Sequence, residues 1–162
     1  MKRKVHWTIL FLLLMGSSIL CAGKASVPET RKTPPAENPP PFHDHAPTEP
    51  LPATLDPASL RDNPPAFVAY SLAARIRTVL YQVPCYCPCG RLAGHKSLLD
   101  CFTTRHGVSC KACQTEAIYC FEQHKKGKTP AQIREAMQKG EMWRLNLDKY
   151  VTRFLRKAQR SQ

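Results

Sequence analysis

The sequence predicts a small all-α domain of four to five short helices with a cysteine-rich loop, preceded by a disordered, Pro-rich tether. Apolar residues recur at helical spacing in the second half of the chain, between capping residues and glycines. Prolines gather in the first half, where large apolar side chains are sparse. No segment shows a convincing β-strand pattern. The 162 residues therefore leave room for one modest domain after the outer segments are set aside.

The first 23 residues have the three-part order of a signal peptide. A basic start at residues 2–4 precedes an apolar run from Trp7 to Leu20, and small residues follow at Ala22 and Gly23. The run is shorter than the roughly 20 apolar residues that span a bilayer, which favours cleavage over a membrane anchor. We therefore expect an exported protein, in the periplasm or at the cell surface.

Cys21 raises lipid anchoring as an alternative, because bacterial lipoprotein signals end at a cysteine. The preceding Leu20 fits poorly, since that position is normally Gly or Ala. Cleavage after Gly23 would remove Cys21 and leave seven of the eight cysteines. Seven is odd, so they cannot all pair as disulfides within one molecule.

Residues 24–65 form the predicted tether, which is too poor in apolar residues to bury a core. It contains a His-Asp-His trio at residues 43–45, which we interpret as a solvated patch rather than a metal site. The folded domain is expected over residues 66–162, after the breaking sequence Asn63-Pro64-Pro65.

The helices of this domain are predicted from periodicity and caps. The first is expected over 66–83, with apolar residues at helical spacing and no breaker before Pro84. The loop at 84–94 combines prolines, glycines and alternating cysteines, and is expected to lack regular structure. The remaining predicted helices are 97–102 with Ser97 as a cap, 110–126 after Ser109, 130–139 after Thr129, and an amphipathic stretch over 142–162.

Five cysteines are the first candidates for metal ligands. Cys85, Cys87 and Cys89 alternate in a tight loop, where such close neighbours rarely bond to each other. Cys110 and Cys113 form a C-x-x-C pair at a predicted helix start. The two groups together predict a thiolate site for a soft ion, Zn(II) or Cu(I), with Cys101 as the next ligand.

Further ligands are predicted on the helix expected over 110–126. At 100° per residue, its cysteines, Ala117 and His124 fall within an arc of roughly 80°. Cysteines can also act as small apolar residues of a core, which would explain one or two of them on such a face. Three cysteines and a histidine are harder to explain in this way. The possible further ligands are His95, His106, Cys120 and His124.

The strings PCYCPCG, GHKSLLDCF and CKACQTEA together resemble the family of bacterial exported proteins named for its PCYCGC motif, whose function is unassigned. The resemblance covers residues 84–135. It implies an extracytoplasmic, often lipid-anchored protein with a cysteine-rich metal site. Pro88 stands where the name-giving motif has Gly, so the geometry of the loop is expected to differ. The pattern maps onto Cys85, Cys87, Cys89, Gly94, His95, Lys96, Cys101, Cys110 and Cys113, followed by Glu116 and Ala117.

Two other functions compete with metal buffering or delivery. The first is a structural or interaction domain stapled by disulfides, because small exported domains often need them. The second is a thiol-disulfide oxidoreductase built on Cys110 and Cys113, although the chain lacks the βαβ pattern of that fold. No paired carboxylates or nucleophile-base arrangement stand out, so we predict a binding protein and not an enzyme.

The formal net charge of +12 suggests two further kinds of binding partner, anionic lipid and nucleic acid. The basic C-terminal helix can rest on anionic lipid, although packing of its apolar face on the domain is the more usual use of this pattern. Nucleic acid is not expected, because the protein is predicted to be exported and no basic recognition motif is present.

Overall fold

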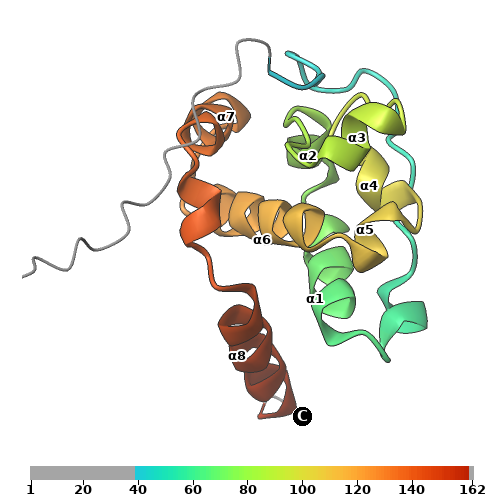
Figure 1. Ribbon diagram of the computed structural model, residues 1–162, viewed down its shortest axis with the longest axis vertical. Helices are drawn as coiled ribbons and strands as arrows, with labels where there is room; N and C mark the ends of the chain where they lie inside the picture. Colours follow the sequence, from blue (N-terminus) through green and yellow to red (C-terminus); the bar gives the residue numbers. More distant parts are fainter. Residues whose placement is uncertain (1–38, 161–162) are drawn as a thin grey trace, which may run out of the picture. The chain divides into compact units, whose positions relative to one another are not determined.

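The computed structural model of the chain describes residues 39–160. Within this range the backbone forms eight α-helices and two 3-10 helices, without a strand (Figure 1). The predicted all-α fold is confirmed for these residues, although the helices outnumber the four to five expected. The predicted signal peptide at 1–23, with Cys21, and the start of the tether lie outside the described residues.

Helix α1 (Pro64–Ala73) begins where the sequence predicts. Two prolines fill its first positions, where a backbone N–H is not needed, and the Asn63 side chain accepts the N–H of Ala66 at 3.2 Å. Most of its residues are buried.

The single helix expected over 66–83 is wrong, because the chain turns at Ala74–Ile76 before entering α2 (Arg77–Tyr81). Two N–H groups in the turn bond carbonyls three residues back, both at 3.1 Å. The turn lets Val79 and Leu80 return to the core beside the buried helix α1, which a straight continuation would not do. Packing sets this break, since no Gly or Pro occurs there.

Three single-turn helices follow: α3 (Pro88–Leu92), α4 (Asp100–Thr103) and α5 (His106–Ser109). The expectation that the loop at 84–94 lacks regular structure is therefore wrong. Pro88 occupies the first position of α3, where its fixed φ favours a helix and its missing N–H costs nothing.

Asp100, and not Ser97, holds the turn that leads into α4. Its Oδ2 accepts the backbone N–H groups of Lys96 at 2.7 Å and Ser97 at 3.3 Å. The Ser97 hydroxyl is buried without a hydrogen-bond partner, so the predicted cap is wrong.

Helix α6 (Lys111–Lys125) confirms the long helix predicted over 110–126. Cys110 precedes it, whereas Ser109 ends α5 and does not cap α6. Gly127, with φ of 80°, ends the helix by donating its N–H to the carbonyl of His124 at 2.8 Å.

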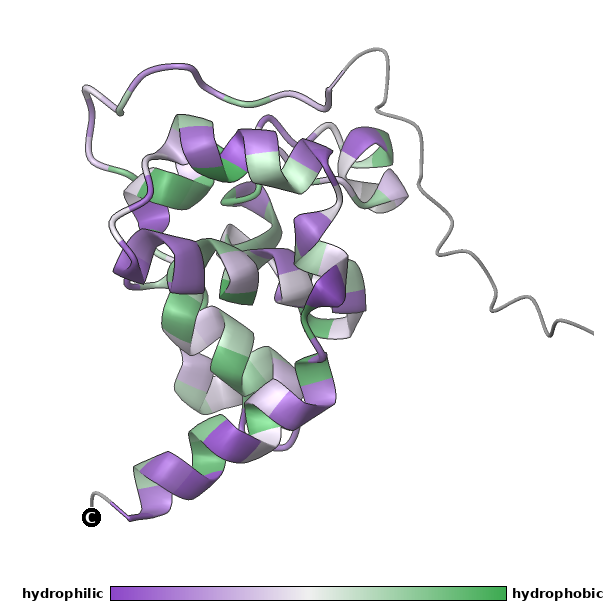
Figure 2. Ribbon diagram, turned by 90° about the vertical axis from the view of Figure 1, so that its left-hand side faces the viewer, coloured by the Kyte–Doolittle hydropathy of each residue, from purple (hydrophilic) through white to green (hydrophobic). Residues whose placement is uncertain are grey.

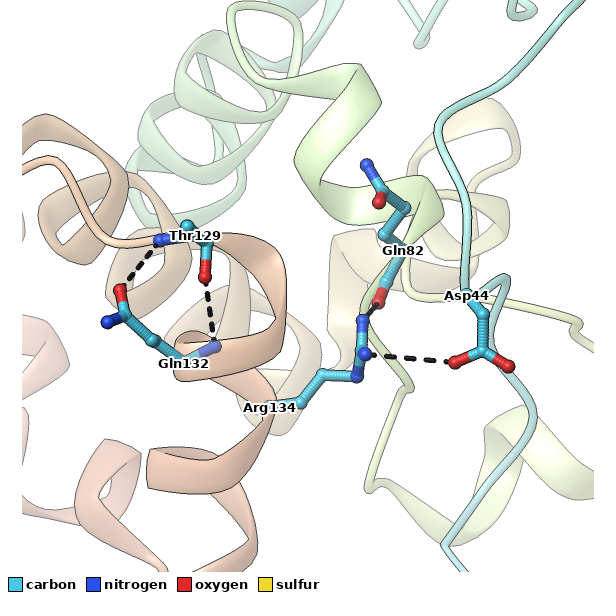
Figure 3. A network of polar contacts seen from close by, with 5 residues as sticks. All are labelled: Asp44, Gln82, Thr129, Gln132 and Arg134. Atoms are coloured by element: carbon cyan, nitrogen blue, oxygen red, sulfur yellow. Dashed lines mark hydrogen bonds and ion pairs between the residues drawn. The ribbon is translucent and has the colours of Figure 1, made fainter.

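Helix α7 (Pro130–Gln138) is confirmed with its predicted cap. Thr129 Oγ1 accepts the N–H of Gln132 at 3.3 Å, and the Gln132 side chain accepts the N–H of Thr129 at 3.0 Å (Figure 3). Gly140, with φ of 73°, follows the helix as the sequence predicts.

The C-terminal stretch forms η2 (Glu141–Arg144) and the amphipathic helix α8 (Leu147–Gln159), which carries both hydrophobic and hydrophilic residues (Figure 2). Phe154 and Leu155 of α8 pack against the core. None of the described helices is long and apolar enough to cross a bilayer. The predicted association of this helix with a membrane surface stays a prediction. Its basic residues are exposed: Lys149, Arg153, Arg156, Lys157 and Arg160.

Helices α1 and α6 pack against each other at the centre of the core, and α2, α5, α7 and α8 contact α6 around them. The largest fully buried side chain is Tyr70 of α1. Its hydroxyl lies near two carbonyl oxygens, those of Cys101 at 3.1 Å and Thr104 at 2.6 Å. Tyr70 thereby fixes the backbone of α4 against α1.

Residues 39–63, expected to be part of a disordered tether, instead lie along the helices and include η1 (Pro57–Leu60). Side-chain contacts compensate for the segment's lack of a core of its own. Arg134 of α7 lies 4.3 Å above the Phe42 ring, 3.7 Å from Asp44, and bonds the carbonyl of Gln82 at 2.9 Å (Figure 3). The predicted solvated patch at 43–45 is thus partly engaged, since His43 also stacks on Tyr81.

Candidate metal centre

Four thiols from separate parts of the chain meet in the interior. Cys85 and Cys87 lie between α2 and α3, Cys101 lies in α4, and Cys113 lies in the first turn of α6. We call these four residues the thiol cluster. Each of their side chains is at most 3 % exposed.

Cys113 lies at the centre of the thiol cluster. Its Sγ is 3.8 Å from that of Cys85, 3.7 Å from that of Cys87 and 3.5 Å from that of Cys101. The Sγ atoms of Cys85 and Cys101 are 3.6 Å apart. A disulfide requires a separation of about 2.05 Å, so these are contacts between free thiols. These four separations are close to the edge of about 3.8 Å of a tetrahedron with metal–sulfur bonds of about 2.3 Å, which has six such edges.

Local packing brings these sulfurs together. Gly90 of α3 approaches Cys85 so closely that an added Cβ would lie 3.2 Å from its Sγ. The N–H of Leu98 bonds the carbonyl of Val83 at 2.8 Å, which ties the residues before α4 to those before the loop. The Tyr70 hydroxyl donates a hydrogen bond to the carbonyl of Cys101 at 3.1 Å, and this bond fixes the position of α4 relative to α1.

The thiol cluster favours one negative charge that its members share. The pKa of the Cys85 thiol is lowered, because the thiols of Cys101 and then Cys113 donate hydrogen bonds to its thiolate. The same contacts with Cys101 and Cys85, followed by burial, raise the pKa of Cys113. The dipole of α6, a helix of 15 residues whose first turn contains Cys113, favours this negative charge in the cluster.

Glu116 is a fully buried carboxyl beside the thiol cluster, one turn after Cys113. Its Oε1 accepts the N–H of Tyr86 at 3.1 Å, whereas Oε2 has no hydrogen-bond partner. Burial, followed by the charge of Cys85, raises the pKa of this carboxyl well above its usual range. These shifts favour the protonated form of Glu116, in which the carboxyl can donate a hydrogen bond to a thiolate.

Two histidines extend the site beyond Cys101. His95 Nδ1 lies 3.2 Å from the Sγ of Cys101, and His106 Nδ1 lies 3.2 Å from His95 Nε2. Both rings are half-buried. The ligand atoms of these three residues lie within 4.8 Å of one another, so they can hold a metal ion.

Two of the predicted ligands lie outside this arrangement. A helix rises 1.5 Å per residue, so Cys120 is about 10 Å and His124 about 16 Å along the axis from Cys113. Cys120 is buried against the sulfur of Met137 at 3.7 Å, and His124 is exposed. One ion at Cys113 can use neither.

The remaining predicted ligands are Cys89 and Cys110. Cys110 lies at the start of α6, is half-buried and approaches Cys87, whose pKa it helps to raise after burial and the charge of Cys85. Cys89 lies in α3, but its side chain is outside the described part of the structure.

Sequence reasoning did not assign a role to Glu116. One signal was present, because this acidic residue lies one turn after Cys113 and directly before the apolar run at 117–121. A carboxyl that such a helix carries into the core is either neutral or paired. Tyr70, which holds Cys101 through its backbone, gave no signal beyond its place on an apolar helix.

The fold and the site define a small helical protein with a buried thiol cluster, of which three members, Cys85, Cys87 and Cys113, lie close enough together to hold a metal ion. A family model matches residues 43–141, described as a protein of unknown function with a PCYCGC motif. The chain therefore belongs to this family, and the predicted resemblance is confirmed over a longer range than 84–135. No curated protein and no solved structure matches the chain significantly.

Proposed function

We propose that this protein binds a soft metal ion, Zn(II) or Cu(I), through thiolates of the thiol cluster. The observation that supports this most is that the Sγ of Cys113 lies 3.5 to 3.8 Å from three other buried sulfurs. Four thiolates in closed coordination suit Zn(II), and a set of soft ligands also suits Cu(I).

The surroundings of the thiol cluster support the binding of a cation. Four buried thiols cannot all lose their protons without a positive charge between them, and a metal ion supplies that charge. Glu116, as a neutral donor beside Cys85, can hydrogen-bond a coordinated thiolate and orient it.

A domain stapled by disulfides is the competing function. Its framework needs one partner for each sulfur, whereas Cys113 contacts three sulfurs at nearly equal distances. This favours shared coordination over a defined pairing. The thiol-disulfide oxidoreductase has less support, since the described residues form no β-strand and therefore no βαβ unit around the C-x-x-C pair.

We place this function outside the cytoplasm, on the signal-peptide pattern of residues 1–23. There the protein would buffer or deliver the ion rather than use it in catalysis. Coordination would also keep the thiols from oxidising in that compartment.

The test is native mass spectrometry of the full chain, purified anaerobically, with free thiols counted in the same samples. We expect a stoichiometric Zn(II) or Cu(I) that leaves with chelator, together with reduced cysteines. The variant Cys113→Ser should lower the affinity for Zn(II) at least about 100-fold, since loss of even an outer partner of a ligand costs 10- to 100-fold.

Cys120→Ser is the matched control, because Cys120 is equally buried in the same helix and lies outside the thiol cluster. It should keep the affinity of the wild type. A metal-free protein lighter by about two protons per disulfide would overturn metal binding and support the stapled domain.

A further inference from the structure

Atoms that can ligate a metal ion lie on two sides of Cys101. On one side its Sγ lies 3.6 Å from that of Cys85 and 3.5 Å from that of Cys113. On another it lies 3.2 Å from Nδ1 of His95, which leads to His106. One sulfur thus belongs both to the thiol cluster and to the group of His95, Cys101 and His106.

The backbone holds each histidine in place. Gly94, with φ of 69°, ends α3, so that the N–H of His95 bonds the carbonyl of Gly90 at 2.9 Å. Thr104 Oγ1 accepts the N–H of His106 at 3.3 Å at the start of α5. The two rings meet edge to face, with centroids 4.6 Å apart.

The two groups differ in burial and in ligand type. The thiol cluster is sealed in the core, whereas both imidazoles are half-buried and open to solvent. A thiolate carries more than one lone pair and can bind two ions at once. Two imidazoles and one thiolate form a ligand set suited to Zn(II) or Cu(I). We expect this set to bind the ion less tightly than a set of four thiolates.

We propose that this protein holds a second metal ion, bound by His95, His106 and the thiolate of Cys101, which bridges it to the ion of the thiol cluster. This rests on the proposed function, because the bridge requires an occupied cluster. The histidine site, being half-buried, exchanges its ion with solvent faster than the sealed cluster and is the position through which ions are loaded.

The experiment is a Zn(II) titration of the full chain, prepared anaerobically and followed by native mass spectrometry. The wild type should bind two ions. His95→Gln and His106→Gln should each bind one, with the affinity for the first ion changed less than about 3-fold. Cys101→Ser should lose the second ion and also weaken the first at least 10-fold. His124→Gln is the matched control, since His124 is exposed at the end of α6, and it should bind two.

The outcomes separate this proposal from the proposed function. One ion in the wild type, unchanged in both histidine variants, would overturn the second site and leave the thiol cluster as a metal site. Two ions retained in either histidine variant would also overturn it. No ion in the wild type would overturn both proposals.

Discussion

Gly90 is the residue on which the position of Cys85 depends most directly. An added Cβ would lie 3.2 Å from the Sγ and 3.3 Å from the Cβ of Cys85, tighter than ordinary contacts. We therefore expect Gly90→Ala to displace this sulfur by a few tenths of an ångström. The affinity for Zn(II) should fall about 10-fold, as it does when a residue that hydrogen-bonds a metal ligand is lost. A Zn(II) titration against a competing chelator measures this effect.

Gly127→Ala is the control for that variant. Gly127 has open space around its Cα but a φ of 80°, so alanine there costs about 1 kcal/mol of stability through backbone strain. We expect a lower melting temperature with unchanged affinity for Zn(II). If Gly90→Ala also left the affinity unchanged, Cys85 would not be a ligand that the fold holds in place.

Glu116 makes the stability of the metal-free protein depend on pH. Its pKa is raised in the folded state, so above about pH 4.5 the folded protein keeps a proton that the unfolded chain has lost. The contribution of this carboxyl to stability should therefore fall as pH rises, by at most about 1.4 kcal/mol per pH unit, until its folded pKa is reached.

Glu116→Gln removes this titration while an amide oxygen can still accept the N–H of Tyr86. We expect the variant to match the wild type near pH 5 and to exceed it increasingly towards pH 8, in urea unfolding with chelator present. Parallel stability curves for the two proteins would show that the carboxylate is already ionised in the fold.

At the scale of elements, Arg134 joins α7 to α2 and to residues 39–63 (Figure 3). Its side chain is 17 % exposed, and its hydrogen bond to the carbonyl of Gln82 is assisted by its charge. We expect Arg134→Ala to cost about 2 kcal/mol and to speed proteolysis within 39–63, measured by urea unfolding and limited proteolysis.

Lys139→Ala is the matched control for Arg134→Ala. Lys139, directly after α7, pairs with Glu135 one turn earlier, and both side chains are exposed, where such pairs contribute at most about 1 kcal/mol. Equal proteolysis of both variants would mean that Arg134 does not fasten the N-terminal segment.

The elements that the sequence predicted well have boundaries set by local chemistry. Thr129 with Gln132 starts α7 and Gly127 ends α6, so the signals lie within a few residues of each boundary. The break after α1 carries no such signal, because it arises from which apolar side chains can reach the core. The single-turn helices α3 to α5 likewise depend on contacts with distant parts of the chain.

The candidate site was predictable in composition but not in extent. Cysteine spacing grouped Cys85 and Cys87 with Cys113, and the structure brings these together. The helical arc also grouped Cys120 and His124 with them, because an arc describes direction around a helix and not distance along it. Cys101 joins the cluster from α4 through a turn that the sequence does not specify.

At the scale of the whole molecule, the thiol cluster joins three parts of the fold, which are the loop before α3, helix α4 and helix α6. Helices α3, α4 and α5 have four or five residues each, too short to be stable alone. The domain is also small, so folding buries only a modest fraction of the surface that the unfolded chain exposes. A metal ion would link the loop, α4 and α6 at one point, and its binding free energy would add to the stability of the fold.

Metal binding should therefore raise the melting temperature of the full chain. At a free Zn(II) concentration of 100 times Kd, the gain is about 2.7 kcal/mol, or about 10 °C for a domain of this size. Differential scanning calorimetry with Zn(II) and with chelator measures the shift. Cys120→Ser should keep the shift and Cys113→Ser should lose most of it. A wild type that melts at the same temperature in both conditions would mean that these sulfurs pack as core side chains and do not bind the ion.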